Sequence, residues 1–513
     1  MSRRELLWVL VALAVAIGML PLAGGAVLWT HPLWLDELCC TVFPTIGAAS
    51  PVQVVANIAR GQDYAPPLLH LLVWGVGRLV GELTPTVLRS ISVACVALAL
   101  LFVYATLRRR FDRVPSAAAA VAVASHPLVL AHAFEARFYG PWLLFAAAFA
   151  WSLGSLTRRN AWLQATLAVC LVTIHWFGVL SLALMCVVAV AAVVAFTGRW
   201  REGILRIAPS GAGLLALAAL MPVALAQRTG SSDFLWIPAL SGAQIMGIAQ
   251  VFFLTAVPII ATLLLALETL SPDVARPVSV PVTIRDALRD PGVAALGALA
   301  FMPVALVAVS ILIQPSLFER YAIVTVLCWA PLVALALASV GRSGGVIALL
   351  LLGLLLGRNV RSAIGERRAF AELVRSNTAA YEQAKPLNVP IVFPDLHTIY
   401  PVLGPARLEP TRARVLDLPD STLRALYPSN RLEWLRRRTR VEINSAWSHN
   451  RVYGFPAVVT SAELSATPRF LVLASDLRIP GGVKQAENWG RVVFPNHRVT
   501  RIGQSLSLFE KAP

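Results

Sequence analysis

The sequence carries little charge for its length. Only 14% of its 513 residues are Asp, Glu, Lys or Arg, while 57% are hydrophobic. A soluble domain of this size is roughly 25% charged and 45–50% apolar. Lysine is almost absent: the chain has Lys385, Lys484 and Lys511, so its net charge of +17 comes mainly from arginine. This composition excludes a wholly soluble globular protein and indicates a membrane protein.

Reactive and nucleotide-binding motifs are also scarce. The last of the six cysteines is Cys328, and their spacing is typical neither of a disulfide framework nor of a zinc site. The adjacent Cys39 and Cys40 are interpreted as small buried thiols. The chain has no glycine-rich phosphate loop, no His-x-x-x-His pair and no serine-centred nucleophile elbow. The sequence therefore gives no support to nucleotide-dependent chemistry on the inner side of a membrane.

Long apolar runs fill the first 358 residues. A membrane-spanning helix needs ~20 mainly apolar residues. On this criterion residues 1–358 are predicted to form a mainly α-helical, polytopic membrane bundle of about eleven spans. The predicted spans are 6–28, 86–107, 114–132, 137–156, 161–175, 176–197, 207–226, 240–269, 293–314, 320–340 and 344–358.

Arginines in the short loops set the predicted orientation. With the N-terminus inside, the inner segments hold fifteen arginines and the outer loops six, the bias expected for cytoplasmic loops. The apolar segment 66–80 opens with Pro66-Pro67 and is too short to cross, so it is predicted to be a helix on the outer face. It belongs to a first outer loop of about residues 29–85, and long outer loops are usually functional.

The last 155 residues have the composition of a soluble domain. Residues 359–513 carry 22 basic and 13 acidic side chains and no cysteine. Next to a membrane domain, this basic charge favours anionic lipid headgroups or a phosphate-bearing substrate over nucleic acid. After a linker helix at 361–385, helical stretches alternate with strand-like runs, which predicts a small extracytoplasmic α/β or α+β domain. These runs are 389–393, 440–443, 457–460, 470–474, 492–494 and 505–509.

Three acidic residues of the first outer loop are candidates for chemistry. Asp36 and Glu37 follow the first span between apolar neighbours, and desolvation makes a carboxylate a better base. A helix N-cap is an equally good interpretation of Asp36. Asp63 precedes Pro66-Pro67 and is a second acidic candidate, with capping of the following helix as its alternative.

Arginines open several predicted spans on the outer side. Arg89 opens one, and Arg137 and Arg320 lie in Glu135-Ala-Arg-Phe-Tyr139 and Glu319-Arg-Tyr321. Such arginines commonly anchor a helix at the membrane surface, but their forked donors could also hold a phosphate from several sides. His175, beside Trp176 and Phe177, is interpreted as part of the aromatic belt at the membrane interface.

The order of these motifs resembles that of the GT-C membrane glycosyltransferases. Within that fold it is most similar to the protein O-mannosyltransferase-like group, family 39, which includes protein mannosyltransferases and lipid A aminoarabinose transferases. The matching segments occur in the family's order. They are Trp34-Leu-Asp-Glu37, Tyr64-Ala-Pro-Pro-Leu68, Leu88-Arg-Ser90, Glu135-Ala-Arg-Phe-Tyr139, Thr173-Ile-His-Trp-Phe177 and Glu319-Arg-Tyr321.

This resemblance implies roles for individual residues. Asp36 becomes the catalytic base with Glu37 beside it, and Arg89 orients an acidic group or meets phosphate. Arg137 and Arg320 join Arg89 as candidates for binding the donor phosphate. The family often has His, or an acidic residue and Lys, before the two prolines, whereas this chain has Tyr64 and Ala65 there. The supporting residues expected at the site are Tyr64, Glu135, Tyr139, His175 and Tyr321.

The expected activity is transfer of a sugar from a polyprenyl-phosphate donor to an acceptor hydroxyl on the outer face of a bacterial inner membrane. Asp36 would take the proton, and the arginines would stabilise the leaving phosphate, with inversion at the anomeric carbon. The acceptor would be a glycolipid, a glycan or a protein. No cofactor is required, although Asp36 and Glu37 could bind a divalent metal. The alternatives are a transporter or flippase of lipid-linked sugars and a non-catalytic scaffold.

Overall fold

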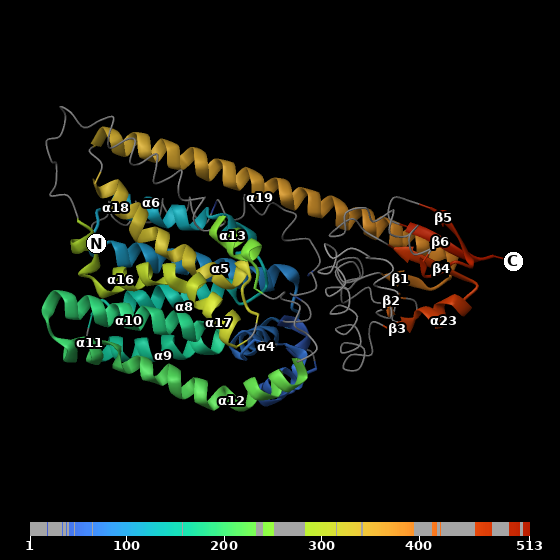
Figure 1. Ribbon diagram of the computed structural model, residues 1–513, viewed down its shortest axis with the longest axis horizontal. Helices are drawn as coiled ribbons and strands as arrows, with labels where there is room; N and C mark the ends of the chain where they lie inside the picture. The colour runs from blue at the N-terminus through green and yellow to red at the C-terminus, as the bar shows by residue number, and fades with distance from the viewer. Residues whose placement is uncertain are drawn as a thin grey trace.

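The computed structural model describes most of the helical part and the sheet of the C-terminal part. Its described residues are 18, 33, 37, 41–45, 47–63, 65–155, 157–231, 240–250, 283–313, 315–339, 342–393, 413–417, 421, 457–473, 492–502 and 506–512. Most of the predicted spans 6–28 and 240–269 lies outside these residues. Figure 1 shows a bundle of helices at one end of the molecule and a small sheet at the other, joined by one long helix.

The helical part follows the predicted apolar runs closely. Five helical segments within the described residues are long and apolar enough to cross a membrane: Pro85–Leu107, Gly178–Thr197, Trp200–Gln227, Pro291–Leu312 and Glu319–Ala338. The elements of this part are α3 (Pro51–Asn57), η3 (Ile58–Gln62), α4 (Leu68–Val80), α5 (Pro85–Leu107), α6 (Arg113–Ala124), α7 (Pro127–His132), α8 (Tyr139–Ser152), α9 (Arg158–Ile174), α10 (Gly178–Thr197), α11 (Trp200–Ile207), η4 (Ala208–Ser210), α12 (Gly211–Ser231), α13 (Gly242–Ala249), α15 (Ile284–Leu288), α16 (Pro291–Ala298), η6 (Leu299–Phe301), α17 (Met302–Leu312), η7 (Glu319–Cys328) and α18 (Trp329–Ser339).

Two predicted spans differ from the structure in their helical geometry. The predicted span 114–132 was wrong as a single helix, because it divides into α6 and α7 at Ser125 and His126. Pro127 cannot continue α6 but suits the first position of a helix, and His126 caps that helix by accepting from the Leu128 amide. The predicted span 320–340 begins as the 3-10 helix η7 and becomes α-helical only at Trp329.

Helix α5 packs against α8 through a close backbone approach. A Cβ atom on Gly140 would lie 2.6 Å from the Ser92 carbonyl oxygen, so only glycine fits there. The Ser92 hydroxyl also donates to the Glu135 carbonyl at 2.5 Å. This contact places the segment before α8 directly against the N-terminal half of α5.

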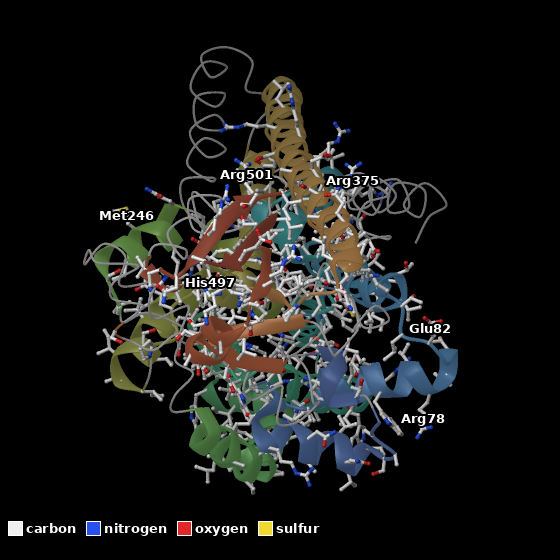
Figure 2. All side chains as sticks on the ribbon, turned by 90° about the vertical axis from the view of Figure 1, so that its right-hand side faces the viewer. Arg78, Glu82, Met246, Arg375, His497 and Arg501 are labelled. Carbon is white, nitrogen blue, oxygen red and sulfur yellow. The ribbon has the colours of Figure 1, made fainter. Side chains whose placement is uncertain are left out.

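The first outer loop forms a small helical layer rather than a further span. Helix α4 has 13 residues, fewer than the ~20 needed to cross. The Trp74 indole donates to the Ala48 carbonyl at 2.9 Å, and Arg78 donates to the Ala49 carbonyl. Figure 2 places Arg78 and Glu82 at one edge of the molecule, where Leu79 is 86% exposed. The structure thus has the predicted helix at 66–80 with an exposed apolar end.

A 43-residue helix, α19 (Arg342–Ala384), joins the two parts of the chain. At 1.5 Å per residue it extends about 65 Å. It passes without a break through the predicted boundary at 358/359, so the predicted last span and the linker helix are one element. Asn359 donates to the Ser125 carbonyl at 3.2 Å, and Arg367 donates to the Leu130 carbonyl. Both contacts fix α19 to the α6–α7 region.

The C-terminal part contains a mixed six-stranded sheet of order β3-β2-β1-β4-β6-β5. Strands β1, β2, β3 and β4 are parallel, while β6 is antiparallel to β4 and β5. Phe470, Phe494 and Phe509 pack together on one side, and Tyr381 of α19 reaches Phe393. The strands are β1 (Ile391–Phe393), β2 (Ala413–Asp417), β3 (Ala457–Thr460), β4 (Arg469–Leu473), β5 (His497–Arg501) and β6 (Leu506–Lys511), with η8 (Lys385–Leu387) before β1 and α23 (Ser461–Ala466) between β3 and β4. This arrangement is the α/β domain that the sequence predicts.

Candidate active site

Glu37 is buried in an ion pair that joins three distant segments. Its side chain is 1% exposed. Arg89 donates from Nε to Oε1 at 3.1 Å and from Nη2 to Oε2 at 2.7 Å, and the Ala136 amide donates to Oε1 at 2.8 Å. Two parallel bonds of this kind fix both side chains strongly. Glu37 therefore ties the first outer loop to α5 and to the segment before α8.

Arg89 is placed by the start of α5. Thr84 caps this helix by accepting from the Val87 amide, and Pro85 occupies its first turn, as expected for a helix N-terminus. The guanidinium is then buried, and its Nε and Nη2 bind the Glu37 carboxylate. Asp36 and Tyr64, which the sequence also assigns to the site, lie outside the described residues.

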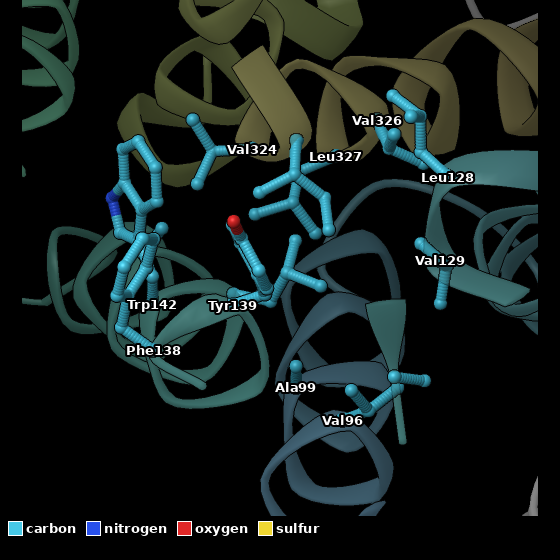
Figure 3. Packing of buried hydrophobic residues seen from close by; sticks show 14 of the residues in the cluster. Val96, Ala99, Leu128, Val129, Phe138, Tyr139, Trp142, Val324, Val326 and Leu327 are labelled. Carbon is cyan, nitrogen blue, oxygen red and sulfur yellow. The ribbon is translucent and has the colours of Figure 1, made fainter. Parts of the chain in front are cut away.

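The segment between α7 and α8 carries the next group of predicted residues. Glu135 is 3.0 Å from Nδ1 of His132. Arg137 is buried and stands 5.0 Å over the Phe138 ring. Tyr139, fully buried, begins α8, and Figure 3 shows its ring extending toward Val324 and Leu327 of η7. The Glu135–Tyr139 motif thus lies between α5 and η7, with Arg137 and Tyr139 buried in the protein.

His175 lies at the centre of a cluster of aromatic rings. It is in the connection between α9 and α10, stacked on Trp142 with centroids 4.6 Å apart. Phe138, Phe177 and Tyr321 surround it at 4.1, 5.2 and 5.5 Å. Its Nδ1 accepts from the Phe177 amide at 3.2 Å. His175 is therefore a buried member of the site, and the interpretation as part of the interfacial aromatic belt is wrong.

Several charges converge on this aromatic cluster. Arg137 stands over the Phe138 ring and Arg320 over the Tyr321 ring, and both rings contact His175. Gln227 donates to the Asp63 carbonyl and accepts from the indole of Trp176, the residue after His175. The structure thus brings Asp63, Arg137 and Arg320 to the same cluster, although they lie far apart in the sequence.

Arg320 approaches the cluster from η7. Its Cζ is 5.0 Å from the Phe318 ring and 5.9 Å from the Tyr321 ring. Tyr321 in turn contacts His175 and Phe177. A guanidinium that rests on an aromatic ring is attracted to it through a cation–π contact. Arg137 and Arg320 thus each stand beside a ring that contacts His175.

Asp63 is buried at the end of η3 and belongs to the same region. Its Oδ2 lies 3.0 Å from Nε2 of His70, in the first turn of α4. Helix α4 has Pro67 at its N-cap and no side-chain cap. The alternative in which Asp63 caps this helix is therefore wrong.

Two polar side chains at the site were not selected from the sequence. Gln227 of α12 donates to the Asp63 and Ala65 carbonyls at 2.9 and 3.1 Å, and it accepts from the Trp176 indole at 3.2 Å. His70 is fully buried against Asp63. Gln227 is more than 160 positions from Asp63 and Ala65 and 51 from Trp176, so no local pattern could reveal it. A histidine and a glutamine inside otherwise apolar helices were the available signals.

The described residues contain no group of three His, Cys, Asp or Glu side chains arranged as metal ligands. Asp36 lies outside these described residues. Glu37 uses its carboxylate on Arg89 and the Ala136 amide. Any metal at Asp36 and Glu37 would thus have to compete with these bonds.

The fold and the site define a polytopic membrane protein of the GT-C type, with buried arginines and a carboxylate at one end of its helices. The family model for dolichyl-phosphate-mannose-protein mannosyltransferases matches residues 64–225. This range begins directly after Asp63. It includes Arg89, the Glu135–Tyr139 motif and His175. No curated protein matches the sequence.

Solved structures extend this similarity to nearly the whole chain. ArnT from Cupriavidus metallidurans in the apo state is 13% identical, with a TM-score of 0.59, and the match covers 98% of this chain and 97% of ArnT. The structure of ArnT bound to undecaprenyl phosphate is 12% identical, with a TM-score of 0.58 and the same coverage. The oligosaccharyltransferase AglB from Archaeoglobus fulgidus is 14% identical, with a TM-score of 0.45, over 79% of this chain and 65% of AglB. The two ArnT structures confirm the predicted GT-C fold.

Proposed function

We propose that this chain is an integral membrane glycosyltransferase that takes its sugar from a polyprenyl-phosphate donor. The observation that carries this proposal is that Arg137 and Arg320 stand over rings that contact His175, with Asp63 linked to the same cluster through Gln227 and Trp176. Arg137 is buried and Arg320 half-buried, and arginines so placed are costly in a membrane protein unless they serve a ligand or a partner. The family match at 64–225 and the ArnT fold support a glycosyltransferase over a transporter.

Arg137 and Arg320 are the proposed phosphate-binding residues. Both lie at the same end of the bundle, each beside an aromatic ring that fixes its guanidinium. Arginine matches phosphate through paired N–H donors. A structure of the same fold, ArnT, holds undecaprenyl phosphate. Arg89, which the sequence also suggested for phosphate, is instead assigned to Glu37, because Nε and Nη2 both bind that carboxylate.

The proposed reaction is a single displacement. The acceptor hydroxyl gives its proton to Asp36, and its oxygen forms a bond to the anomeric carbon of the sugar. The bond from that carbon to the phosphate oxygen breaks, and the lipid phosphate leaves with its charge held by Arg137 and Arg320. Attack opposite the leaving group inverts the anomeric centre. Preorganised donors at a developing charge are often the largest contribution to catalysis.

Glu37 is proposed to hold Asp36 in place rather than to act as a second base. Its bonds to Arg89 and to the Ala136 amide fix the chain next to Asp36. Both oxygens of the Glu37 carboxylate accept hydrogen bonds from Arg89, so the proposal assigns the base to Asp36.

The proposed setting is a bacterial inner membrane with residues 359–513 on its outer side. The arginine bias of the short loops supports this orientation. A glycolipid, glycan or protein hydroxyl would be the acceptor, reaching the site from the outer side.

Removal of either phosphate-binding arginine tests this proposal. Arg137→Ala and Arg320→Ala are expected to weaken binding of undecaprenyl phosphate roughly 10- to 100-fold each, because a bond to a charged group contributes roughly 1.5–3 kcal/mol. Arg78→Ala is the matched control, since Arg78 stands 5.5 Å over the Trp74 ring but belongs to α4. Binding is measured by titration of purified protein. Unchanged affinity in both variants would show that the two arginines are only anchors.

A further inference from the structure

The segment from Asp63 to Pro67 is held by side chains from three separate elements. Gln227 of α12 donates both of its amide hydrogens, one to the Asp63 carbonyl and one to the Ala65 carbonyl. The indole of Trp176, just before α10, donates to the Gln227 carbonyl oxygen. Gln227 is 3% exposed, so these bonds are shielded from water. The backbone on either side of position 64 is therefore fixed.

His70 fixes the side chain of the same segment. Its Nε2 is 3.0 Å from Oδ2 of Asp63, and the imidazole and the carboxylate are 0% and 5% exposed. A buried carboxylate needs such a partner, because an isolated buried charge is costly. Backbone and carboxylate of Asp63 are thus both oriented by buried groups.

This arrangement does not serve to start α4, because that helix has no side-chain cap. The same bonds connect Asp63 to the proposed phosphate site, because Trp176 directly follows His175, and Arg137 and Arg320 stand over rings that contact His175.

We infer that Asp63, positioned by Gln227, Trp176 and His70, accepts a hydrogen bond from a hydroxyl of the donor sugar. The inference rests on the proposed function. A carboxylate repels phosphate but binds sugar hydroxyls well, and the sugar is joined directly to the phosphate that Arg137 and Arg320 would hold. A site built to bind a hydroxyl rejects ligands that lack it. Asp63 would then be a specificity-determining residue, and the other three would be positioning residues.

The experiment compares sugar-free undecaprenyl phosphate with a panel of undecaprenyl-phosphate hexoses and pentoses. In the wild-type protein, at least one sugar is expected to tighten binding by about tenfold over the sugar-free lipid, as for one added bond to a charged group. Asp63→Asn, Gln227→Leu and His70→Leu should remove most of this gain. The quantity compared is the ratio of the two affinities within each variant, because loss of the Asp63 charge is itself expected to strengthen binding of the sugar-free lipid phosphate.

Two further variants separate positioning from general stability. Gln164 is the matched control for Gln227: it is 2% exposed and donates to the Arg206 carbonyl and the Ser210 hydroxyl at the inner end of α9. Gln164→Leu should lower thermal stability as much as Gln227→Leu but keep the sugar-dependent gain. His70→Gln, which keeps a donor for Asp63, should restore much of the gain lost in His70→Leu.

The outcomes are distinct. A wild type that binds every sugar-bearing lipid no better than the sugar-free lipid overturns the inference, as does a retained gain in Asp63→Asn. Equal losses for both kinds of lipid in Asp63→Asn would show that Asp63 shapes the whole site and does not bind the sugar. Failure of the wild type to bind undecaprenyl phosphate at all would instead contradict the proposed function.

Discussion

Glu37 and Arg89 form a buried pair that joins three segments of the candidate site. Both are at most 5% exposed, and their two hydrogen bonds cross from the first outer loop to α5. The Ala136 amide adds the segment that carries Arg137. The ion pair therefore sets the relative position of the proposed base and one proposed phosphate ligand.

Breaking this pair from either side should be costly. Glu37→Gln and Arg89→Met should each destabilise the protein by about 3–5 kcal/mol, because each leaves one buried charge without its partner. The double variant should be less destabilised than the sum of the two, since both charges are then removed. Thermal unfolding in detergent measures the effect. Strictly additive losses would show that the two side chains do not depend on each other.

At this scale the sequence predicted the identity of the polar residues better than their partners. The motifs containing Glu37, Arg89 and Arg137 were recognised, and the structure places them in one region. That Arg89 binds Glu37, and that His175 is enclosed by rings of α8 and η7, depends on contacts between segments about 30 to 150 residues apart. Such contacts are set by packing and leave no local pattern. Gln227 was missed for the same reason, whereas His70 is close to Asp63 in the sequence but was not recognised as its partner.

Helix α19 is the element that connects the two parts of the molecule. Arg367 donates to the Leu130 carbonyl, and its guanidinium stands 4.5 Å over the Phe134 ring. Phe134 is buried and directly precedes the Glu135–Tyr139 motif. At its other end α19 packs Tyr381 against Phe393 of the sheet. One rigid element thus touches both the sheet and the segment that carries Arg137.

Removing the Arg367 contact should loosen this connection. Arg367→Ala is expected to lower stability by about 1–2 kcal/mol, from the lost carbonyl bond and the lost contact with the Phe134 ring. Arg368→Ala is the control, because Arg368 is the adjacent, exposed arginine of the same helix. Both are compared by thermal unfolding of the full chain. Equal, small effects in the two variants would contradict a specific role for Arg367.

Local signals predicted most elements but not how they break or join. The apolar runs predicted the helices, and the alternating runs predicted strands near β1, β3, β4 and β6. The predicted strand at 492–494 was wrong: Phe494 packs in the core, but the chain there turns into β5. Strand β2 was missed, and the predicted strand at 440–443 lies outside the described residues. The prediction divided helix α19 at residue 358 because the composition of the chain changes there. The helix itself continues through this position.

The whole molecule is a membrane helical bundle joined to a mixed sheet, and the fold of ArnT covers both parts. The sequence predicted this division from the loss of apolar runs after residue 358. Its arginine bias also predicts which side of the membrane the sheet occupies. The end of the bundle that holds Arg137, Arg320 and Asp63 is then the outer one, where a lipid-phosphate donor and its acceptor could meet.

The measurement that tests this account most directly is sugar transfer by the purified chain in proteoliposomes, with the undecaprenyl-phosphate sugar that it binds best. Asp36→Asn keeps the shape of the side chain but removes its basic oxygen. The account predicts that the release of sugar-free lipid phosphate falls roughly 10²- to 10⁴-fold in this variant, while its unfolding temperature stays near that of the wild type. A near-normal rate of release in Asp36→Asn would contradict the account, because the proposed base would then play no part in the transfer.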